Sequence, residues 1–251
     1  MKKMTLAAVA ASVALAACST APSQPAKKTA WGYTGSGAPE HWASLSPEYA
    51  ACAGKNQTPI NISKLALVDA NLPPIKFSYK PGGNEIINNG HTVQVNFAPG
   101  SYIEVNNTRF DLKQYHFHTP SENQIDGKSY PIEGHLVHAD KDGNLAVVGV
   151  MYEEGAANAA LGAFESTVPT KLNEKQALKT PFDANSLLPA NRDYYSFSGS
   201  LTTPPCSEGV RWMVLKNHVF ASKAQIDTLN KAMHGPNNRP LQPVNARTVL
   251  H

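Results

Sequence analysis

The 251-residue sequence lacks a run of basic residues with interleaved aromatics, an internal repeat and a second linker, and it contains only three cysteines. The missing basic stripe argues against a nucleic-acid partner. The missing repeat and linker argue against an array or several domains, and one chain of this length can bury a complete core. These absences favour a single globular domain that does not bind nucleic acid.

The N-terminal stretch from Thr5 to Ala17 is apolar, follows Lys2 and Lys3, and is too short to span a bilayer. This pattern is typical of a secretory signal peptide. Leu15-Ala16-Ala17-Cys18 also resembles the lipobox of bacterial lipoproteins, in which the cysteine is lipidated and becomes the mature N-terminus. We therefore expect residues 1–17 to be a lipoprotein signal peptide and Cys18 to carry the lipid. Plain cleavage after Ala16 is the alternative.

Residues 18–29 are rich in Ser, Thr, Ala, Pro, Gln and Lys, which predicts a flexible tether before a domain over residues 30–251. Removing Lys2 and Lys3 with the signal lowers the formal charge from +3 to +1. We expect the mature protein in the periplasm of a bacterial cell envelope, attached to a membrane only through an N-terminal lipid anchor. The sequence is compatible with a homodimer.

The cysteines fit this compartment. Once Cys18 carries the lipid, Cys52 and Cys206 remain as an even pair in an oxidising environment. A disulfide between them would close a long loop, for which chain entropy predicts a stabilisation of about 4–5 kcal/mol. Two buried free thiols are the alternative.

Short β-rich runs separated by turn clusters predict a mainly antiparallel sheet protein. Two short helices are predicted at Ala156–Ser166 and at Ser222–Met233, where Ser222 can cap the helix. The predicted strands include Ile75–Tyr79, Thr92–Phe97, Ser101–Val105, Lys113–His118, Ile132–His138, Leu145–Tyr152 and Val210–Leu215.

Asp126-Gly127 lies between two β-rich runs and is the strongest short-range signal of a two-residue hairpin. Pairing extended from this turn places His118 directly opposite His135, and strand alternation puts His116 on the same face. Opposed and diagonal Cβ atoms lie about 5 and 7–8 Å apart, which suits three imidazoles around one zinc ion with an open fourth position. Pro120 can shift the register; a shift of two residues keeps the shared face, and a shift of one destroys it.

Seven motifs occur in order, two of which contain these histidines: Trp31-Gly32-Tyr33, Pro39-Glu40-His41-Trp42, Gln57-Thr58-Pro59-Ile60-Asn61-Ile62, Asn88-Asn89-Gly90-His91, Gln114-Tyr115-His116-Phe117-His118, Glu133-Gly134-His135-Leu136-Val137-His138 and Gly199-Ser200-Leu201-Thr202-Thr203-Pro204-Pro205. With them the chain resembles the α-class carbonic anhydrases of the bacterial secreted branch, from Trp31 to about Arg247. The resemblance implies a mainly β single domain with a central, mostly antiparallel twisted sheet of about ten strands and a few short peripheral helices. It also implies zinc-dependent reversible hydration of carbon dioxide to bicarbonate and a proton, by attack of a zinc-bound hydroxide with histidine proton shuttling.

The resemblance makes His116, His118 and His135 the zinc ligands. It makes Gln114 and Glu133 the partners that fix the ligand rings through their second nitrogens. Both lie two residues before a ligand and so share its face. The alternative for both is an ordinary polar residue on a solvated face. A buried carboxylate without a partner would be costly, which favours the role of ligand partner.

Thr202 matches the family's gatekeeper, whose hydroxyl donates to Glu122 and whose N–H holds a bicarbonate oxygen. Thr203 is expected to contact bicarbonate and ordered water. His91 matches the proton shuttle, because an imidazole with a pKa near 6.5 can both accept and release a proton. Alternatively, Glu122 is an ordinary loop carboxylate and His91 a turn residue.

Further residues match the surroundings of the family's metal. Those expected to order the water chain are Tyr33, Asn89 and Gln94, and those expected to form an apolar wall for carbon dioxide are Val137, Val147, Leu201 and Trp212, each of which could equally be simple core. The resemblance also implies that a Cys52–Cys206 disulfide holds the Thr-Thr-Pro-Pro loop next to the metal. The other histidines are expected to be structural or exposed, namely His41, His138, His218, His234 and His251; His138 is off the zinc face by parity.

Two other interpretations compete. His116, His118 and Glu122 resemble the first half of a cupin metal motif, but the glycines that frame that motif are missing and the Thr-Thr-Pro-Pro loop would be unexplained. A non-enzymatic domain of the same fold, used as an adhesin or a zinc reservoir, would bind zinc without turnover.

Overall fold

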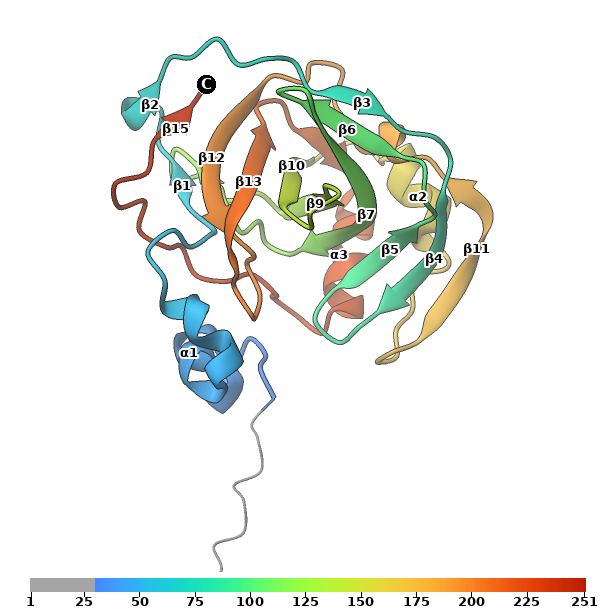
Figure 1. Cartoon of the computed structure of the whole chain (residues 1–251). Helices are drawn as coiled ribbons and strands as arrows, with labels where there is room; N and C mark the ends of the chain where they lie inside the picture. Colours follow the sequence, from blue (N-terminus) through green and yellow to red (C-terminus); the bar gives the residue numbers. More distant parts are fainter. Residues whose placement is uncertain (1–29) are drawn as a thin grey trace, which may run out of the picture.

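A computed structural model describes residues 30–251 (Figure 1). The predicted signal peptide, the lipidation site Cys18 and the tether lie outside the described residues. No helix in the described range is both long enough and apolar enough to cross a membrane. The described chain is mainly β, as predicted from the sequence.

One large twisted sheet organises the domain, in the order β11-β4-β5-β7-β9-β10-β13-β12-β15-β2, with β14 also paired to β10 and a β3-β6 pair joined to β7. The separate strands β1 and β8 form a small parallel pair. The strands are β1 Asn61–Ile62, β2 Leu67–Val68, β3 Lys76–Ser78, β4 Gly83–Asn88, β5 Val93–Phe97, β6 Tyr102–Val105, β7 Thr108–His118, β8 Gln124–Ile125, β9 Ile132–Ala139, β10 Leu145–Glu154, β11 Lys175–Phe182, β12 Tyr194–Ser200, β13 Glu208–Leu215, β14 Val219–Ala221 and β15 Val249–Leu250.

The sheet is larger and more mixed than the predicted ten or so strands, because it has 13 strands and several parallel pairs. β10 runs parallel to β13 and β14, and β15 runs parallel to β2. β10 reads Leu-Ala-Val-Val-Gly-Val-Met-Tyr, a nearly continuous apolar run, because it lies in the middle of the sheet and is buried on both faces. Parallel neighbours need long crossover connections, which leave no hairpin signal in the sequence.

Helices are short and peripheral. They are α1 Trp42–Leu45, α2 Ala159–Glu165 and α3 Lys223–Ala232, with 3-10 turns at Gly35–Gly37, Pro39–His41, Pro47–Ala53, Lys64–Ala66 and Ala184–Leu187. α2 and α3 confirm the two predicted helices. Ser222 caps α3, and Gln225 completes a capping box by bonding back to the Ser222 N–H.

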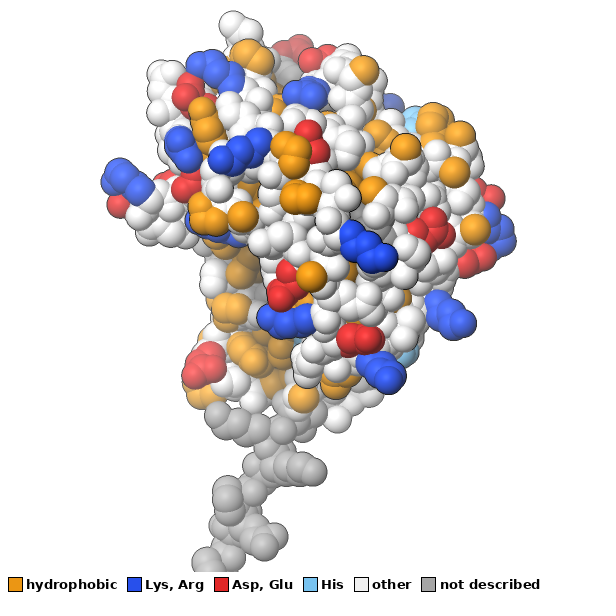
Figure 2. Space-filling model, turned by 90° about the vertical axis from the view of Figure 1, so that its right-hand side faces the viewer, with side chains coloured by type: hydrophobic (Ala, Val, Ile, Leu, Met, Phe, Trp, Pro, Cys, Tyr) orange, Lys and Arg blue, Asp and Glu red, His pale blue; other side chains and the backbone are white. Residues whose placement is uncertain are grey.

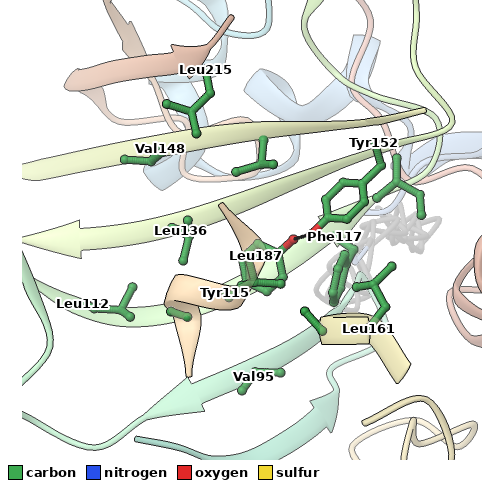
Figure 3. Close-up of a cluster of buried hydrophobic side chains, with 14 of the residues drawn as sticks. Val95, Leu112, Tyr115, Phe117, Leu136, Val148, Tyr152, Leu161, Leu187 and Leu215 are labelled. Carbon is green, nitrogen blue, oxygen red and sulfur yellow. Dashed lines mark hydrogen bonds between the residues drawn. The ribbon is translucent and has the colours of Figure 1, made fainter. Parts of the chain in front are cut away.

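Alternation along β7 separates the core from the histidines. Tyr115 and Phe117 point into the larger core, where the Tyr115 and Tyr152 hydroxyls are 2.7 Å apart (Figure 3). His116 and His118 point to the opposite face of the sheet, beside a second apolar cluster. The sheet thus places a dry core behind the ligand strands and holds their backbone in a fixed register.

The Asp126-Gly127 turn is present, but the register predicted from it is wrong by two residues. Both turn residues have positive φ, 49° and 75°, and Ile125 and Lys128 exchange both backbone hydrogen bonds. Farther out, however, His116 and not His118 lies opposite His135. The intervening segment leaves the ladder and bonds elsewhere: Gln124, for example, pairs with β1. A shift of two residues keeps all three histidines on one face.

Candidate metal centre

Three histidines from two adjacent strands form the candidate centre. His116 and His118 come from β7 and His135 from β9, and one ring nitrogen from each lies within 4.8 Å of the others. The Nε2 atoms of His116 and His118 are 3.1 Å apart. His118 and His135 are buried, and His116 is partly open.

Each ring has a partner that leaves one nitrogen for a metal. His116 Nδ1 lies 2.8 Å from Gln114 Oε1, and His118 Nδ1 lies 2.8 Å from the carbonyl of Asn237. Nδ1 is therefore the donor on both rings, and Nε2 faces the centre. His135 is turned the other way: its Nε2 is 3.0 Å from Glu133 Oε1, a close approach without hydrogen-bond alignment, and Nδ1 is the nitrogen left for the ion.

The surroundings keep the two ligands on β7 neutral. Burial, with the nearby His135 as a further cause, lowers the pKa of His116 and His118 well below the usual value for an imidazole. A neutral imidazole is the form that binds zinc, and three histidine ligands with an open side match a catalytic zinc site. The residues present therefore fit a zinc ion.

Glu133 is held more firmly than its position two residues before His135 indicated. Its carboxylate is fully buried and accepts hydrogen bonds from the Glu122 and Asn123 N–H groups and from the Asn123 side-chain amide, at 2.8–2.9 Å. Three donors compensate a buried charge. The alternative of a solvated polar residue is excluded for Glu133.

Glu122 is also buried and lies next to the ligands. Its Oε2 is 3.3 Å from His118 Nε2, and its Oε1 accepts a hydrogen bond from the Arg239 N–H at 2.9 Å. Burial raises the pKa of this carboxyl to about 7, while the proximity of His135 and a hydrogen bond with the Thr202 side chain act in the opposite direction. A dication at the centre would lower the pKa further, because it favours the ionised carboxylate.

The loop that carries Thr202 is fastened at its end. A disulfide joins Cys206 to Cys52, one of the two states predicted for this pair. The Cys206 N–H bonds to the Thr203 carbonyl, and the Leu201 N–H bonds to Ser207. Thr202 is buried in this loop.

The four residues predicted to form an apolar wall lie side by side in the second apolar cluster. Val137 lies opposite Val147 across β9 and β10, and Val147 lies opposite Trp212 across β10 and β13. Leu201 packs against this cluster. The Trp212 ring meets the His135 ring edge-to-face at 4.9 Å, so the wall begins directly beside a ligand.

A cavity of about 110 Å³ opens beside the ligands. His91 and Gln94 line it, together with Gln114, His116 and Thr203. The other lining residues are Trp31, Tyr33, Asn89, Thr92 and His118. The structure thus brings the three residues predicted to order water, Tyr33, Asn89 and Gln94, to one cavity.

His91 is half-buried, and its ring stacks on Trp31 with centroids 3.6 Å apart. Burial lowers its pKa below the usual 6.5. Asn89 Oδ1 accepts the N–H groups of His91 and Thr92, so this oxygen is used to shape the turn and only the Asn89 amide nitrogen is left for water.

Three residues of the site have no counterpart in the sequence prediction. Asn237 supplies the carbonyl for His118, and its side chain also bonds the backbone at Thr119 and Phe117. Asn123 supplies two of the donors to Glu133. Arg239 supplies the N–H for Glu122. Asn237 and Arg239 lie in an irregular segment after α3, where no periodicity marks them.

The remaining histidines lie away from the centre. His138 is buried on the opposite face, as parity predicted, where its Nε2 is 2.7 Å from the Tyr79 hydroxyl. His218 and His251 lie near Glu153 and Asp69, respectively. On the face seen in Figure 2, acidic and basic side chains are interspersed, without a broad area of one sign.

Fold and centre together define a mainly β protein with a three-histidine site of the kind that holds catalytic zinc. Residues 37–251 match the family described as eukaryotic-type carbonic anhydrase. A carbonic anhydrase from Pectobacterium carotovorum is 48% identical over 222 residues, which cover 88% of this chain and 90% of that protein. One from Neisseria gonorrhoeae is 45% identical over 248 residues, or 98% of this chain and 97% of that protein.

The comparison with solved structures leads to the same family. The α-carbonic anhydrase of Thermovibrio ammonificans, in complex with the inhibitor sulfanilamide, superposes with a TM-score of 0.87 at 48% identity, covering 88% of this chain and 99% of that one. The chain belongs to the α-class, or eukaryotic-type, carbonic anhydrase family, whose members are zinc enzymes that hydrate carbon dioxide.

Proposed function

We propose that this chain interconverts carbon dioxide with bicarbonate and a proton, using zinc held by His116, His118 and His135. The observation that carries the proposal is the convergence of one ring nitrogen from each of three histidines within 4.8 Å. When bound there, zinc supplies a nucleophile at neutral pH by lowering the pKa of its water to about 7, a value for which carbonic anhydrase is the standard example.

Glu122 and Thr202 orient the reacting groups. An ionised carboxylate only accepts hydrogen bonds, so the Thr202 hydroxyl donates to Glu122 and its lone pairs are directed to the nucleophile. The Thr202 N–H holds the oxygen on which charge develops as bicarbonate forms. Thr203, on the cavity wall, contacts the same product and ordered water.

Carbon dioxide has no dipole, and the apolar wall formed by Val137, Val147, Leu201 and Trp212 provides a weakly polar surface for it. His91 accepts the proton released in each cycle and passes it to solvent. Its position between the cavity and the surface supports this role, since its ring is only half-buried.

The proposed location is the bacterial periplasm, with Cys18 lipidated and the domain tethered to a membrane. The lipobox-like sequence supports the anchor, and the Cys52–Cys206 disulfide is of the kind that persists in an oxidising compartment. Replacing Cys18 by Ala should abolish incorporation of labelled palmitate and release the protein from the membrane fraction. A wild type that takes up no labelled palmitate and is released from the membrane fraction would instead favour plain cleavage after Ala16.

The test of the activity is stopped-flow carbon dioxide hydration by the mature protein, with zinc content measured on the same sample. We expect one zinc per chain and hydration that is lost on chelation and restored by zinc. His116→Ala should lose both zinc and activity, whereas His218→Ala, a histidine far from the centre, should keep both. Stoichiometric zinc without hydration would instead support a non-enzymatic zinc-binding domain.

A further inference from the structure

A short relay of hydrogen bonds crosses three strands from the edge of the sheet to the cavity. Gln94 Nε2 donates to Asn96 Oδ1 at 2.6 Å, and Asn96 Nδ2 donates to Glu85 Oε1 at 2.7 Å. Lys175 Nζ donates to the same carboxylate oxygen at 3.3 Å. Asn96 lies opposite Glu85 across β4 and β5, and Gln94 lies opposite His116 across β5 and β7.

The carboxylate gives this relay one direction. An amide side chain can present either its oxygen or its nitrogen to a neighbour, so Gln94 and Asn96 alone could adopt two arrangements. Glu85 only accepts, because it is ionised; hydrogen bonds from Asn96 and Lys175 hold the pKa of this carboxyl below its usual range. Asn96 must therefore turn its nitrogen to Glu85 and its oxygen to Gln94.

Gln94 in turn must offer its nitrogen to Asn96, which leaves Oε1 as a free hydrogen-bond acceptor for the cavity. We propose that Glu85 and Asn96 are positioning residues that make Gln94 present a hydrogen-bond acceptor to the cavity water beside His91. An acceptor at this point holds a water by one of its hydrogens and leaves the other hydrogen and the lone pairs for its neighbours. A reversed amide would hold the water by a lone pair instead.

This inference rests on the proposed proton export through His91. Neither Glu85 nor Asn96 is among the residues that line the cavity, so both act on it only through Gln94. The relay therefore affects the transfer of the proton and leaves the reaction with carbon dioxide itself unchanged. In kinetic terms it acts on kcat in weak buffer and not on kcat/KM.

A charge exchange tests the direction of the relay. In the double variant Glu85→Lys/Lys175→Glu the ion pair is kept but a donor faces Asn96, so both amides must reverse. Adding Asn96→Asp to this background places an acceptor between Lys and Gln94 and should restore the original amide orientation. The exchange Glu104→Lys/Lys76→Glu is the matched control, because this cross-strand pair, 2.6 Å apart, joins β3 and β6 away from the cavity.

Two readouts are needed. Neutron diffraction on deuterated crystals locates the amide deuterons of Gln94: we expect them toward Asn96 in the wild type, toward the cavity in the Glu85/Lys175 exchange, and toward residue 96 again after Asn96→Asp. Stopped-flow hydration in weak buffer should show kcat reduced about two- to tenfold in the exchange, the factor that one net hydrogen bond corresponds to. The value of kcat/KM, the zinc content and Tm should be unchanged, and kcat should recover with Asn96→Asp.

The same amide orientation in the wild type and the exchange would overturn the proposal, and so would an unchanged kcat in weak buffer with the amide reversed. A similar loss of kcat in the Glu104/Lys76 control would also overturn it, since the effect would then follow from charge exchange in general. The diffraction result is independent of turnover. A wild type without hydration would therefore contradict the proposed function, while the orientation of Gln94 would still decide whether the relay exists.

Discussion

His91 and His138 differ because of what surrounds each ring. His91 is half-buried, stacked on Trp31 and open to a cavity, so its ring can gain and lose a proton. His138 is enclosed in the core on the opposite face, between the Tyr79 hydroxyl and the Ala146 carbonyl, and burial lowers its pKa to about 3. The first environment supports proton transfer and the second keeps the ring neutral.

Replacing His91 by Ala should leave zinc in place and slow turnover in weak buffer, because water alone then carries the proton. The expected decrease in kcat is about 10- to 100-fold, at or below the lower end of the range of about 10²–10⁴-fold for general acid–base catalysis, because water still carries part of the proton flux, and added imidazole should restore most of it. Stopped-flow hydration over a series of imidazole concentrations measures this effect. Unchanged turnover in weak buffer would assign His91 to the turn alone.

The folded protein should lose stability as the pH falls, in part through His138. Its pKa is about 3 in the folded state, below the usual 6.5, so the unfolded chain binds more protons between these values. Above pH 6.5 His138 is neutral in both states and causes no loss of stability. As the pH falls from 6.5 toward 3, the free energy of unfolding decreases by up to about 1.4 kcal/mol per pH unit because of this residue. Urea unfolding from pH 7 to 4 should show a shallower slope for His138→Phe than for wild type. The exposed-site variant His41→Gln should keep the wild-type slope.

Sequence reasoning found the residues that repeat at strand spacing and missed those that do not. Parity alone put His116 and His118 on one face and predicted that His138 lies on the other. Asn237 and Arg239 contact the same site from 117 to 119 residues farther along the chain, by means of backbone groups. A backbone carbonyl or N–H carries no residue-type signal, so only the folded chain reveals these partners.

At the scale of elements, the β7–β9 pair shows how a correct turn can be combined with a wrong register. The Asp126-Gly127 turn depends on local φ preferences, which residue types report well. Register depends on what the residues between turn and strand bond to, and here Ser121 and Gln124 bond to Tyr130 and β1. The contact with β1 comes from a distant segment, and the Ser121–Tyr130 bond lies outside the β7–β9 ladder, so the pattern near the turn could not predict the register.

Two glycine substitutions should have opposite effects on stability. A Cβ at Gly134 in β9 would collide with the buried Tyr115 ring and hydroxyl, so Gly134→Ala should destabilise the fold by about 1–3 kcal/mol. Gly162 lies on the exposed face of α2, where an added methyl group would have only Gln225 nearby, so Gly162→Ala should stabilise the fold by about 0.5–1 kcal/mol. Chemical denaturation of both variants checks the signs. A stabilised Gly134→Ala variant would contradict the packing described for Tyr115.

At the scale of the whole molecule, the parallel pairing of β10 with β13 brings the Thr202 loop beside the ligand strands. The two strands are joined through α2, β11 and β12, which together form the crossover. Local patterns predicted β-rich runs at both strands but could not predict that they are neighbours, because a parallel pair has no turn between its members. The mainly β class was therefore predictable, whereas the strand order was not.

The disulfide ties the 3-10 turn Pro47–Ala53 to the Thr202 loop over a sequence separation of 154 residues. For a loop of this length the chain-entropy model predicts a stabilisation of about 5 kcal/mol. The double variant Cys52→Ser/Cys206→Ser should lose a stability of that order, and the wild type in reductant should behave alike, as measured by urea unfolding. A difference below about 1 kcal/mol would show that the fold hardly depends on this link.

The spacing of the site along the chain also has a consequence for how the protein folds. The three metal ligands lie between positions 116 and 135 on neighbouring strands, whereas the Asn237 and Arg239 contacts close loops of 119 and 117 residues. Local pairs form early and long loops close late, because loop closure carries an entropy cost that only later contacts offset. We therefore expect the β7–β9 pair with its three histidines to form before the catalytic surroundings. If the proposed zinc binds at that stage, it should act as a folding ligand that stabilises the pair on which the later strands assemble.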